Sequence, residues 1–243
     1  MKRIDLPDAV RLILDTLHGA GYMAYAVGGC VRDSLLGREP HDWDICTSAT
    51  PEQTKTCFGD YRTIDTGIQH GTVTVMVEHT PYEVTTFRKD GNYSNSRHPD
   101  KVTFVSDLKE DLARRDFTIN AMAYNEEKGL VDPFGGQDDL AAQMLRCVGN
   151  PTERFDEDAL RILRALRFAA TYGLWVHPTT KDAIHQKKND LHRIAVERIQ
   201  TEMTKLICAE SALPIMLGFK DVVATVIHEM KVFGLCVCIL SCS

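Results

Sequence analysis

The spacing of apolar residues changes once along the chain, and this change constrains the fold more than any other feature. Up to about residue 140, alternating segments such as HGTVTVMVE and YEVTTFR favour strands, and short helical patterns separate them. We therefore expect an α+β fold, in which a mixed sheet flanked by helices precedes an all-α domain. Beyond about residue 150 the pattern predicts helices over 156–172, 178–188, 194–208 and 211–218.

The expected domains follow from this change of pattern. The mixed domain covers residues 1–145 and the helical domain covers residues 146–218. The remaining segment, 219–243, ends in KVFGLCVCILSCS, which is apolar, favours β structure and lacks a polar face. We expect this segment to be a truncated or aberrant continuation.

Local signals predict several elements of the mixed domain. Residues 8–19 have helical spacing, and YMAYAVGG predicts a strand and a tight turn before a helix over 31–36. Thr50 and the glutamine three residues later match a capping box, which predicts that a helix begins there. We expect Ser106 to cap a helix that runs into an arginine pair. DGNYSNSRHPDK, at 90–101, is typical of a loop.

Composition excludes several classes of protein. The chain is 44% apolar and 26% charged, which is ordinary for a globular protein, and no apolar run is long enough to span a membrane. A net charge of −6 argues against a non-specific nucleic-acid coat protein but leaves RNA open as a substrate. Eight cysteines without a C-x-x-C pair favour reduced thiols in a cytoplasmic protein. The cluster Cys236, Cys238 and Cys242 fits no common zinc-finger spacing.

Two aspartates, Asp42 and Asp44, lie at the start of the predicted strand DWDICT. Alternate residues of a strand share a face, about 6–7 Å apart, so the two carboxylates repel each other unless a cation lies between them. Oxygen ligands of this kind suit Mg²⁺, although the D-x-D pattern alone is also typical of a solvated turn. Glu83, on YEVTTFR, is a candidate third catalytic carboxylate, and an ordinary surface glutamate is the equal alternative.

A pair of glycines, Gly28 and Gly29, follows the first predicted strand. Glycines at such a turn let the backbone approach a ligand closely, and the start of the next helix favours phosphate. Arg32 can donate two hydrogen bonds to a phosphate oxygen pair. A plain strand–helix turn is the alternative for this element alone. Together, the glycine turn with Arg32 and the two aspartates are typical of the palm of a nucleotidyl-transfer enzyme.

Five segments resemble one known family in their order along the chain. GGCVRDSLLGREPHDWDICT resembles the first motif of the class II tRNA nucleotidyltransferases, the CCA-adding enzymes, to which bacterial poly(A) polymerases are closely related. RRDFTINAMAYN, DPFGGQDDL and EDALRILRALRFAA resemble three further motifs, and VERIQTEMTKL resembles a fifth. The resemblance spans about residues 20–210 and is specific because all five motifs occur in sequence.

The resemblance implies a metal site and a triphosphate site. Asp42 and Asp44 are expected to hold catalytic magnesium, and Gly28, Gly29 and Arg32 are expected to hold the triphosphate. The implied reaction is an in-line attack by an RNA 3′-hydroxyl on the α-phosphate, after which pyrophosphate leaves. One metal ion lowers the pKa of the attacking hydroxyl, and a second neutralises the triphosphate.

The resemblance also assigns the rest of the nucleotide. Arg115, with Asp116 and Asn120, is expected near the sugar and phosphates of the incoming nucleotide. Residues 1–145 then form the palm or head domain. Residues 146–218 form a neck that binds nucleotide and RNA.

Base choice is assigned to the helix EDALRILRALRFAA. Asp158 and Arg161 are expected to share a helix face at i and i+3, with Arg164 and Arg167 supporting them. A carboxylate only accepts hydrogen bonds and a guanidinium only donates them. Cytosine and adenine carry an amino donor beside a ring acceptor, whereas guanine and uracil present a carbonyl. Such a pair can accept CTP and ATP without a template, although the residues alone also fit a solvated ion pair.

Three functions are compatible with the sequence. The first is addition of CMP and AMP to the 3′ end of tRNA from CTP and ATP, and the second is a poly(A)-type polymerase acting on other RNA. The third is an inactive fragment that binds nucleotide or RNA, because family members usually continue with further modules beyond the neck, whereas this sequence stops at Ser243. We expect no membrane association and infer no protein partner.

Overall fold

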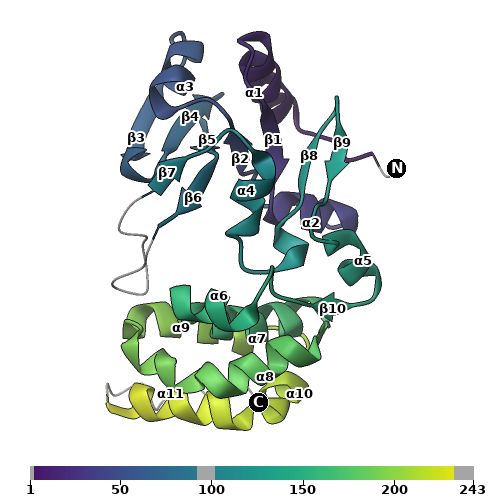
Figure 1. Cartoon of the computed structure of the whole chain (residues 1–243), viewed down its shortest axis with the longest axis vertical. Coiled ribbons are helices and arrows are strands. Elements are labelled where there is room, and N and C mark those ends of the chain that lie inside the picture. The colour runs from purple at the N-terminus through teal and green to yellow at the C-terminus, as the bar shows by residue number, and fades with distance from the viewer. Residues whose placement is uncertain (1–2, 92–101, 233–243) are drawn as a thin grey trace. The chain divides into compact units, whose positions relative to one another are not determined.

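The computed structural model describes residues 3–91 and 102–232. Contacts divide the chain into two compact units, one ending at Leu140 and the other starting at Ala141. Figure 1 colours the first unit purple to teal and the helices of the second unit green to yellow. The division lies close to the boundary expected after residue 145, and the helix beyond residue 218 belongs to the second unit.

A mixed seven-stranded sheet forms the centre of the first unit, in the order β3-β4-β5-β2-β1-β8-β9. Only β2 and β5 pair in parallel, and the other neighbours are antiparallel. This sheet, followed by a helical unit, confirms the expected α+β class. Its strands are β1 (Ala24–Val27), β2 (Ile45–Thr47), β3 (Thr63–Gly67), β4 (Thr72–Val77), β5 (Thr80–Thr86), β8 (Ala123–Asn125) and β9 (Gly129–Val131).

The burial of β1 and β4 agrees with their places inside the sheet. All four residues of β1 are buried, which suits a strand inside the sheet, whereas β4 buries Val73, Val75 and Val77. The remaining elements of this unit are α1 (Asp8–Gly19), α2 (Gly29–Leu35), α3 (Pro51–Cys57), α4 (Leu108–Ala113), α5 (Gly136–Ala141), the 3-10 turns η1 (Ile68–His70) and η2 (Thr118–Asn120), and the hairpin of β6 (Arg88–Asp90) and β7 (Val102–Phe104).

Local expectations for this unit are confirmed at most positions. The helix expected over 8–19 is α1, and the capping box of α3 is present in both directions between Thr50 and Gln53. The expectation for Ser106 is wrong: Asp107 caps α4, because its carboxylate accepts a hydrogen bond from the Lys109 N–H at 2.9 Å. The loop expected at 90–101 lies, apart from its first two residues, outside the described residues.

Helices make up most of the second unit. Helix α7 lies against α6, α9 and α10, and eight of its residues are buried. The short strands β10 (Met144–Leu145) and β11 (Trp175–Val176) pair in parallel. The helices are α6 (Pro151–Glu157), α7 (Leu160–Tyr172), α8 (Pro178–Lys187), α9 (Val196–Ile207), α10 (Ala212–Gly218) and α11 (Lys220–Val232), with the 3-10 segment η3 (Lys188–Arg193).

The structure bears on two expectations for the second unit. The continuous helix expected over 156–172 is wrong, because α6 ends at Glu157 and α7 begins at Leu160. Within 219–243, residues up to Val232 form α11, which contacts α8, α9 and η3. The cluster Cys236, Cys238 and Cys242 lies outside the described residues.

Candidate functional site

Three carboxylates lie near the start of β2, two on the chain that leads into it and one in the middle of the neighbouring strand β5. Asp44 directly precedes β2, and Asp42 lies two residues earlier. On the neighbouring strand, Glu83 directly precedes Val84, which pairs with Ile45 across the parallel β2 and β5. The structure therefore brings Asp44 and Glu83 beside each other, although they are far apart in the sequence.

The charges of these carboxylates influence one another. Loss of hydration raises the pKa of Asp44, nearby Arg115 opposes that rise, and Asp42 adds to it. Loss of hydration also raises the pKa of Glu83, and the negative charges of Asp44 and Asp42 raise it further. An arrangement of this kind favours a bound cation, because a cation removes the repulsion.

The donor set fits a divalent ion that takes part of its coordination from a ligand. Within the described parts of the chain, no three His, Cys, Asp or Glu side chains are placed to bind a metal ion together. Mg²⁺ commonly takes one or two carboxylates and completes its shell with phosphate oxygens and water. Two carboxylates such as Asp42 and Asp44 would fit an ion of this kind.

The glycine turn lies against Arg115. Gly28 has φ +80°, a conformation that L side chains rarely adopt. A Cβ atom at this position would stand 2.8 Å from Nη1 of Arg115, so a side chain there would displace the guanidinium. The Gly28 N–H is already used, because it donates to the Met122 carbonyl at 3.0 Å. The backbone conformation therefore favours glycine at this position, and the arginine lies close enough that a side chain would move it.

Arg32 is buried within a hydrogen-bonded network. Its Nε and Nη2 donate to the two carboxylate oxygens of Asp33 at 3.0 and 2.9 Å, and its Nη1 donates to Oδ1 of Asn120. The Asn120 amide in turn donates to Oδ1 of Asp116 at 3.0 Å. The structure thus brings Arg32, Asp116 and Asn120 together. A direct contact between Arg32 and a triphosphate stays a prediction.

Sequence reasoning missed Asp111, whose carboxylate contacts the backbone of Arg88 and the side chains of Arg114 and Arg115. Its side chain is fully buried, and its Oδ1 accepts from the Arg88 N–H at 3.2 Å and from Nε of Arg114 at 3.0 Å. Its Oδ2 faces Nη2 of Arg115 at 3.6 Å. The spacing of this acid three and four residues before two arginines was the available signal.

The DPFGGQDDL segment holds the turn that contains Asn120. Thr118 Oγ1 donates to Oδ2 of Asp139 at 2.6 Å, and the Asp132 carboxylate accepts from the Gly136 N–H at 2.8 Å. A Cβ atom at Gly136 would stand only 2.3 Å from the Thr118 carbonyl oxygen. Only glycine lets α5 approach η2 this closely. The DPFGGQDDL segment therefore packs against the turn that contains Asn120 and supports it.

In the second unit, the structure corrects the expected pairing of Asp158 and Arg161. Asp158 lies in the break between α6 and α7 with extended backbone angles, φ −149° and ψ 104°, so the two residues do not share a helix face. The Asp158 carboxylate pairs with Arg198 of α9 at 2.8 Å. Arg161 pairs with Glu157 at 2.5 Å and also donates to the Arg154 carbonyl at 3.2 Å.

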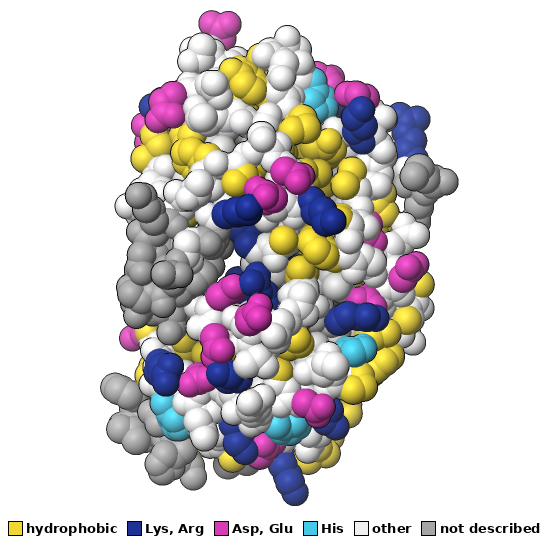
Figure 2. Space-filling view, in the orientation of Figure 1, with side chains coloured by type: hydrophobic (Ala, Val, Ile, Leu, Met, Phe, Trp, Pro, Cys, Tyr) yellow, Lys and Arg dark blue, Asp and Glu magenta, His cyan; other side chains and the backbone are white. Residues whose placement is uncertain are grey.

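The other two predicted arginines of α7 meet at one carboxylate. Arg167 pairs with buried Glu202 of α9 at 2.5 Å, and Arg164 lies 4.0 Å from the same carboxylate. Both guanidiniums also lie over the ring of Phe168. On the face drawn in Figure 2, basic and acidic side chains are intermixed.

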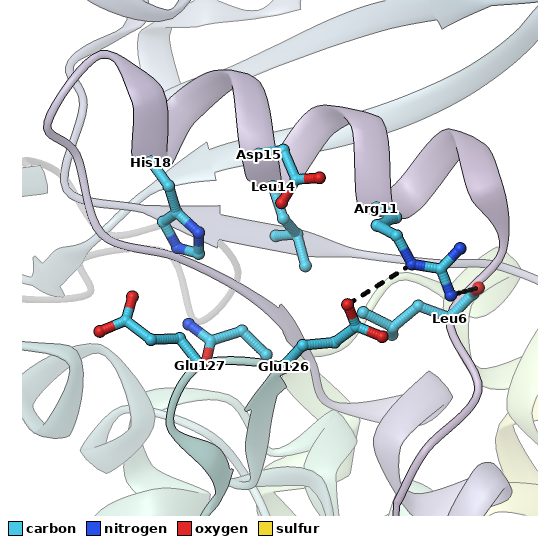
Figure 3. A pocket seen from close by; sticks show the side chains of 8 residues that line it. Leu6, Arg11, Leu14, Asp15, His18, Glu126 and Glu127 are labelled. Atoms are coloured by element: carbon cyan, nitrogen blue, oxygen red, sulfur yellow. Dashed lines mark hydrogen bonds and ion pairs between the residues drawn. The ribbon is translucent and has the colours of Figure 1, made fainter.

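A recess elsewhere in the first unit contains none of the predicted site residues. It lies between α1 and the β8–β9 hairpin and is lined by Leu14, His18 and Glu127, among others (Figure 3). Arg11 closes one side, where its Nε lies 3.5 Å from Glu126. Nothing in this recess resembles the carboxylate and glycine arrangement at β2.

Among the described residues, no helix combines the length and the apolar character needed to cross a bilayer.

Two family models match the chain, one in each unit. The model of the poly A polymerase head domain matches residues 24–146, which include every predicted site residue of the first unit. The model described as a probable RNA and SrmB-binding site of polymerase A matches residues 173–219. Asp158, Arg161, Arg164 and Arg167 lie between the two matched ranges.

Curated relatives are similar over most of the chain. A CCA-adding enzyme of Limosilactobacillus reuteri is 47% identical over 232 residues, which is 94% of this chain and 56% of the relative. A CCA-adding enzyme of Streptococcus suis is 52% identical over 198 residues, which is 82% of this chain and 49% of the relative. The chain thus spans about half the length of the curated relatives it matches.

Solved structures of similar proteins share the fold. The CCA-adding enzyme of Bacillus stearothermophilus in complex with CTP has a TM-score of 0.76 and 46% identity, covering 84% of this chain and 50% of that one. The Thermotoga maritima CCA-adding enzyme complexed with tRNA has a TM-score of 0.72 and 26% identity, covering 96% of this chain and 52% of that one.

Proposed function

Because the chain belongs to the poly A polymerase head-domain family, we propose that it adds CMP and AMP, taken from CTP and ATP, to the 3′ end of tRNA. The observation that carries this proposal is the group of Asp42, Asp44 and Glu83 next to Arg115 and the Gly28 turn. The names of the similar proteins, and the CTP and tRNA in two similar structures, support the choice of substrates. The reaction is assigned to the cytoplasm.

Asp42 and Asp44 would hold Mg²⁺ as protein ligands, and Glu83 is the third carboxylate of the catalytic group. When bound, magnesium would lower the pKa of the RNA 3′-hydroxyl and offset the charge of the triphosphate. The donor set supports this assignment, since the carboxylates repel one another and leave room for phosphate oxygens as further ligands.

The residues around the glycine turn bind and orient the nucleotide. Arg115 offers its guanidinium close to Asp44, where a triphosphate oxygen would complete the charge balance. Gly28 and Gly29 keep side chains away from the phosphates. Asn120 accepts from Arg32 and donates to Asp116 beside this turn. We assign Arg32 to the triphosphate, and Arg115, Asp116 and Asn120 to the sugar and phosphates. Binding of the triphosphate and the sugar by these residues would fix the α-phosphate for in-line attack.

Asp158 and Arg161 are assigned to the base, with Arg164 and Arg167 supporting them through Glu202. A fixed carboxylate acceptor and guanidinium donor match the amino group and ring nitrogen of cytosine and adenine. A carbonyl at that place, as in guanine and uracil, would leave the carboxylate unpaired or repelled. This rejection needs no template strand.

Incorporation of labelled nucleotides tests the proposed function. The full chain with Mg²⁺ and a tRNA that lacks its 3′ CCA should incorporate label from CTP alone. It should incorporate label from ATP only after two cytidines are present. Incorporation of ATP alone in long runs would instead indicate the poly(A)-type reaction. Absence of any incorporation would leave the inactive binding fragment and contradict the proposal.

Substitution at the carboxylates tests their role. Asp44→Asn should reduce incorporation by about a hundredfold or more, because loss of a metal ligand removes several kcal/mol of transition-state stabilisation. Asp60→Asn is the matched control, since Asp60 is exposed on the loop after α3. Circular dichroism should show that both variants fold. Equal activity in the two variants would contradict the metal assignment.

A further inference from the structure

The break between α6 and α7 uses both carboxylate oxygens of Asp158. Oδ1 accepts a hydrogen bond from the Leu160 N–H at 3.0 Å, which begins α7. Oδ2 accepts a hydrogen bond from Nη2 of Arg198 at 2.8 Å, near the start of α9. The side chains of Asp158 and Arg198 are only 15% and 22% exposed, so this pair is more shielded from water than a surface ion pair.

The guanidinium of Arg161 has partners of its own. Its Nη1 is engaged by the Glu157 carboxylate and the Arg154 carbonyl, on the preceding helix. The two residues assigned to the base are thus oriented by separate partners. One of those partners, Arg198, comes from α9, which is distant in the sequence from the others.

Helix α9 presents complementary charges to this region. Arg198 faces Asp158, and Glu202, one turn later, receives Arg164 and Arg167 of α7. Arg198 and Glu202 carry opposite charges on successive turns of α9. Their partners can meet both charges in only one register of α9 against α7. Displacing α9 by one turn would place like charges together, so the arrangement selects a single position for Arg198.

From these contacts we infer that Arg198 is a positioning residue that sets base choice by holding the rotation of the Asp158 carboxylate. This inference rests on the proposed function. Each carboxylate oxygen can accept about two hydrogen bonds, so each retains one direction for a ligand after its protein partner is satisfied. With Arg198 in place that direction is constant. Without it, only the Leu160 N–H holds the carboxylate. The terminal torsion of an aspartate is soft, so the acceptor then meets an amino group less selectively.

Arg198→Met tests the inference, because it keeps a long side chain but removes the donor. Steady-state incorporation is measured with each of the four nucleoside triphosphates on a tRNA lacking its 3′ CCA. We expect the preference for CTP and ATP over UTP and GTP to fall about tenfold or more, which corresponds to about 1.4 kcal/mol. Arg198→Lys, which retains the charge and a donor, should recover most of this preference.

Arg193→Met is the matched control, since Arg193 is 72% exposed and pairs at the surface with Asp190. It should leave all four rates unchanged. A purely structural role of Arg198 predicts equal loss with all four nucleotides, and that result would overturn the inference. An unchanged preference in Arg198→Met would overturn it as well. If Arg198→Met does not fold by circular dichroism, Arg198→Gln takes its place with the same expectations.

A double substitution shows whether the effect passes through Asp158. Asp158→Asn combined with Arg198→Met should be no less selective than Asp158→Asn alone, because the positioned group is already changed. Additive losses would overturn the inference. Failure of the proposed function is distinguishable, since in that case the unmodified chain itself incorporates neither CTP nor ATP.

Discussion

At the scale of single residues, the site depends on how closely Arg115 approaches the backbone at Gly28. The glycine has a positive φ, and a Cβ atom would meet Nη1 of Arg115 at 2.8 Å. Two separate requirements therefore coincide at one position. One is conformational and concerns the stability of the turn, whereas the other is steric and concerns only the arginine that faces Asp44.

Gly28→Ala separates these requirements. We expect a loss of about 1–3 kcal/mol in the free energy of unfolding from backbone strain, and a much larger relative loss of nucleotide incorporation because Arg115 is displaced. Gly21→Ala is the control, since Gly21 has φ +87° but no atom within 4 Å of the place that a Cβ atom would take. Urea unfolding and labelled CTP incorporation measure the two effects. Similar loss of activity in both variants would contradict the steric explanation.

Thiol reactivity gives a second test at this scale. Burial raises the pKa of Cys30 to about 12, whereas Cys208 is exposed on the C-terminal side of α9. At pH 8 only about one in ten thousand Cys30 thiols is then ionised, and the thiolate is the reactive form. Iodoacetamide labelling followed by peptide mapping should modify Cys208 at least a hundredfold faster. Comparable rates would show that the start of α2 around Cys30 opens readily.

At the scale of elements, short helices depend on their caps. Helix α3 has seven residues, and its Thr50 side chain accepts from the Gln53 N–H at 3.3 Å while Gln53 Oε1 accepts from the Thr50 N–H at 2.8 Å. Few intrahelical hydrogen bonds exist in so short a helix. The cap therefore contributes a large share of its local stability.

Thr50→Ala should lower the free energy of unfolding by about 1 kcal/mol, because it leaves a helix N–H without its acceptor. Thr56→Ala, at an exposed position of the same helix, should change it by less than about 0.5 kcal/mol. Chemical denaturation of both variants measures the difference. Equal destabilisation would mean that α3 is held by packing alone and that its cap is dispensable.

At the scale of the whole molecule, metal is expected to serve the reaction and not the fold. The described residues contain no group of three side chains placed to bind a metal ion, and the sheet and helices have apolar cores without one. Treatment with EDTA should therefore abolish incorporation and leave the melting temperature and the circular dichroism unchanged. Readdition of Mg²⁺ should restore activity. A marked fall in melting temperature on chelation would reveal a structural metal ion.

Much of the fold was predictable because it depends on local patterns. The helix over 8–19, the strand before Gly28 and the capping box at Thr50 each follow from residues within a few positions of one another. The change from strands to helices near residue 140 is likewise a matter of periodicity. The error at Ser106 arose because two neighbouring residues can both cap a helix, and only the backbone geometry selects Asp107.

The sequence by itself determined the class of fold, the order of the motifs and the residue types of the site, since these depend on composition and spacing. Only the tertiary structure decided which charged groups meet. Asp158 faces Arg198 instead of Arg161, and Asp111 faces both Arg114 and Arg115. The physical reason is that an ion pair depends on the direction of two side chains. A break of two residues between α6 and α7 changes the direction of Asp158, and the spacing of apolar residues in the sequence does not reveal this break.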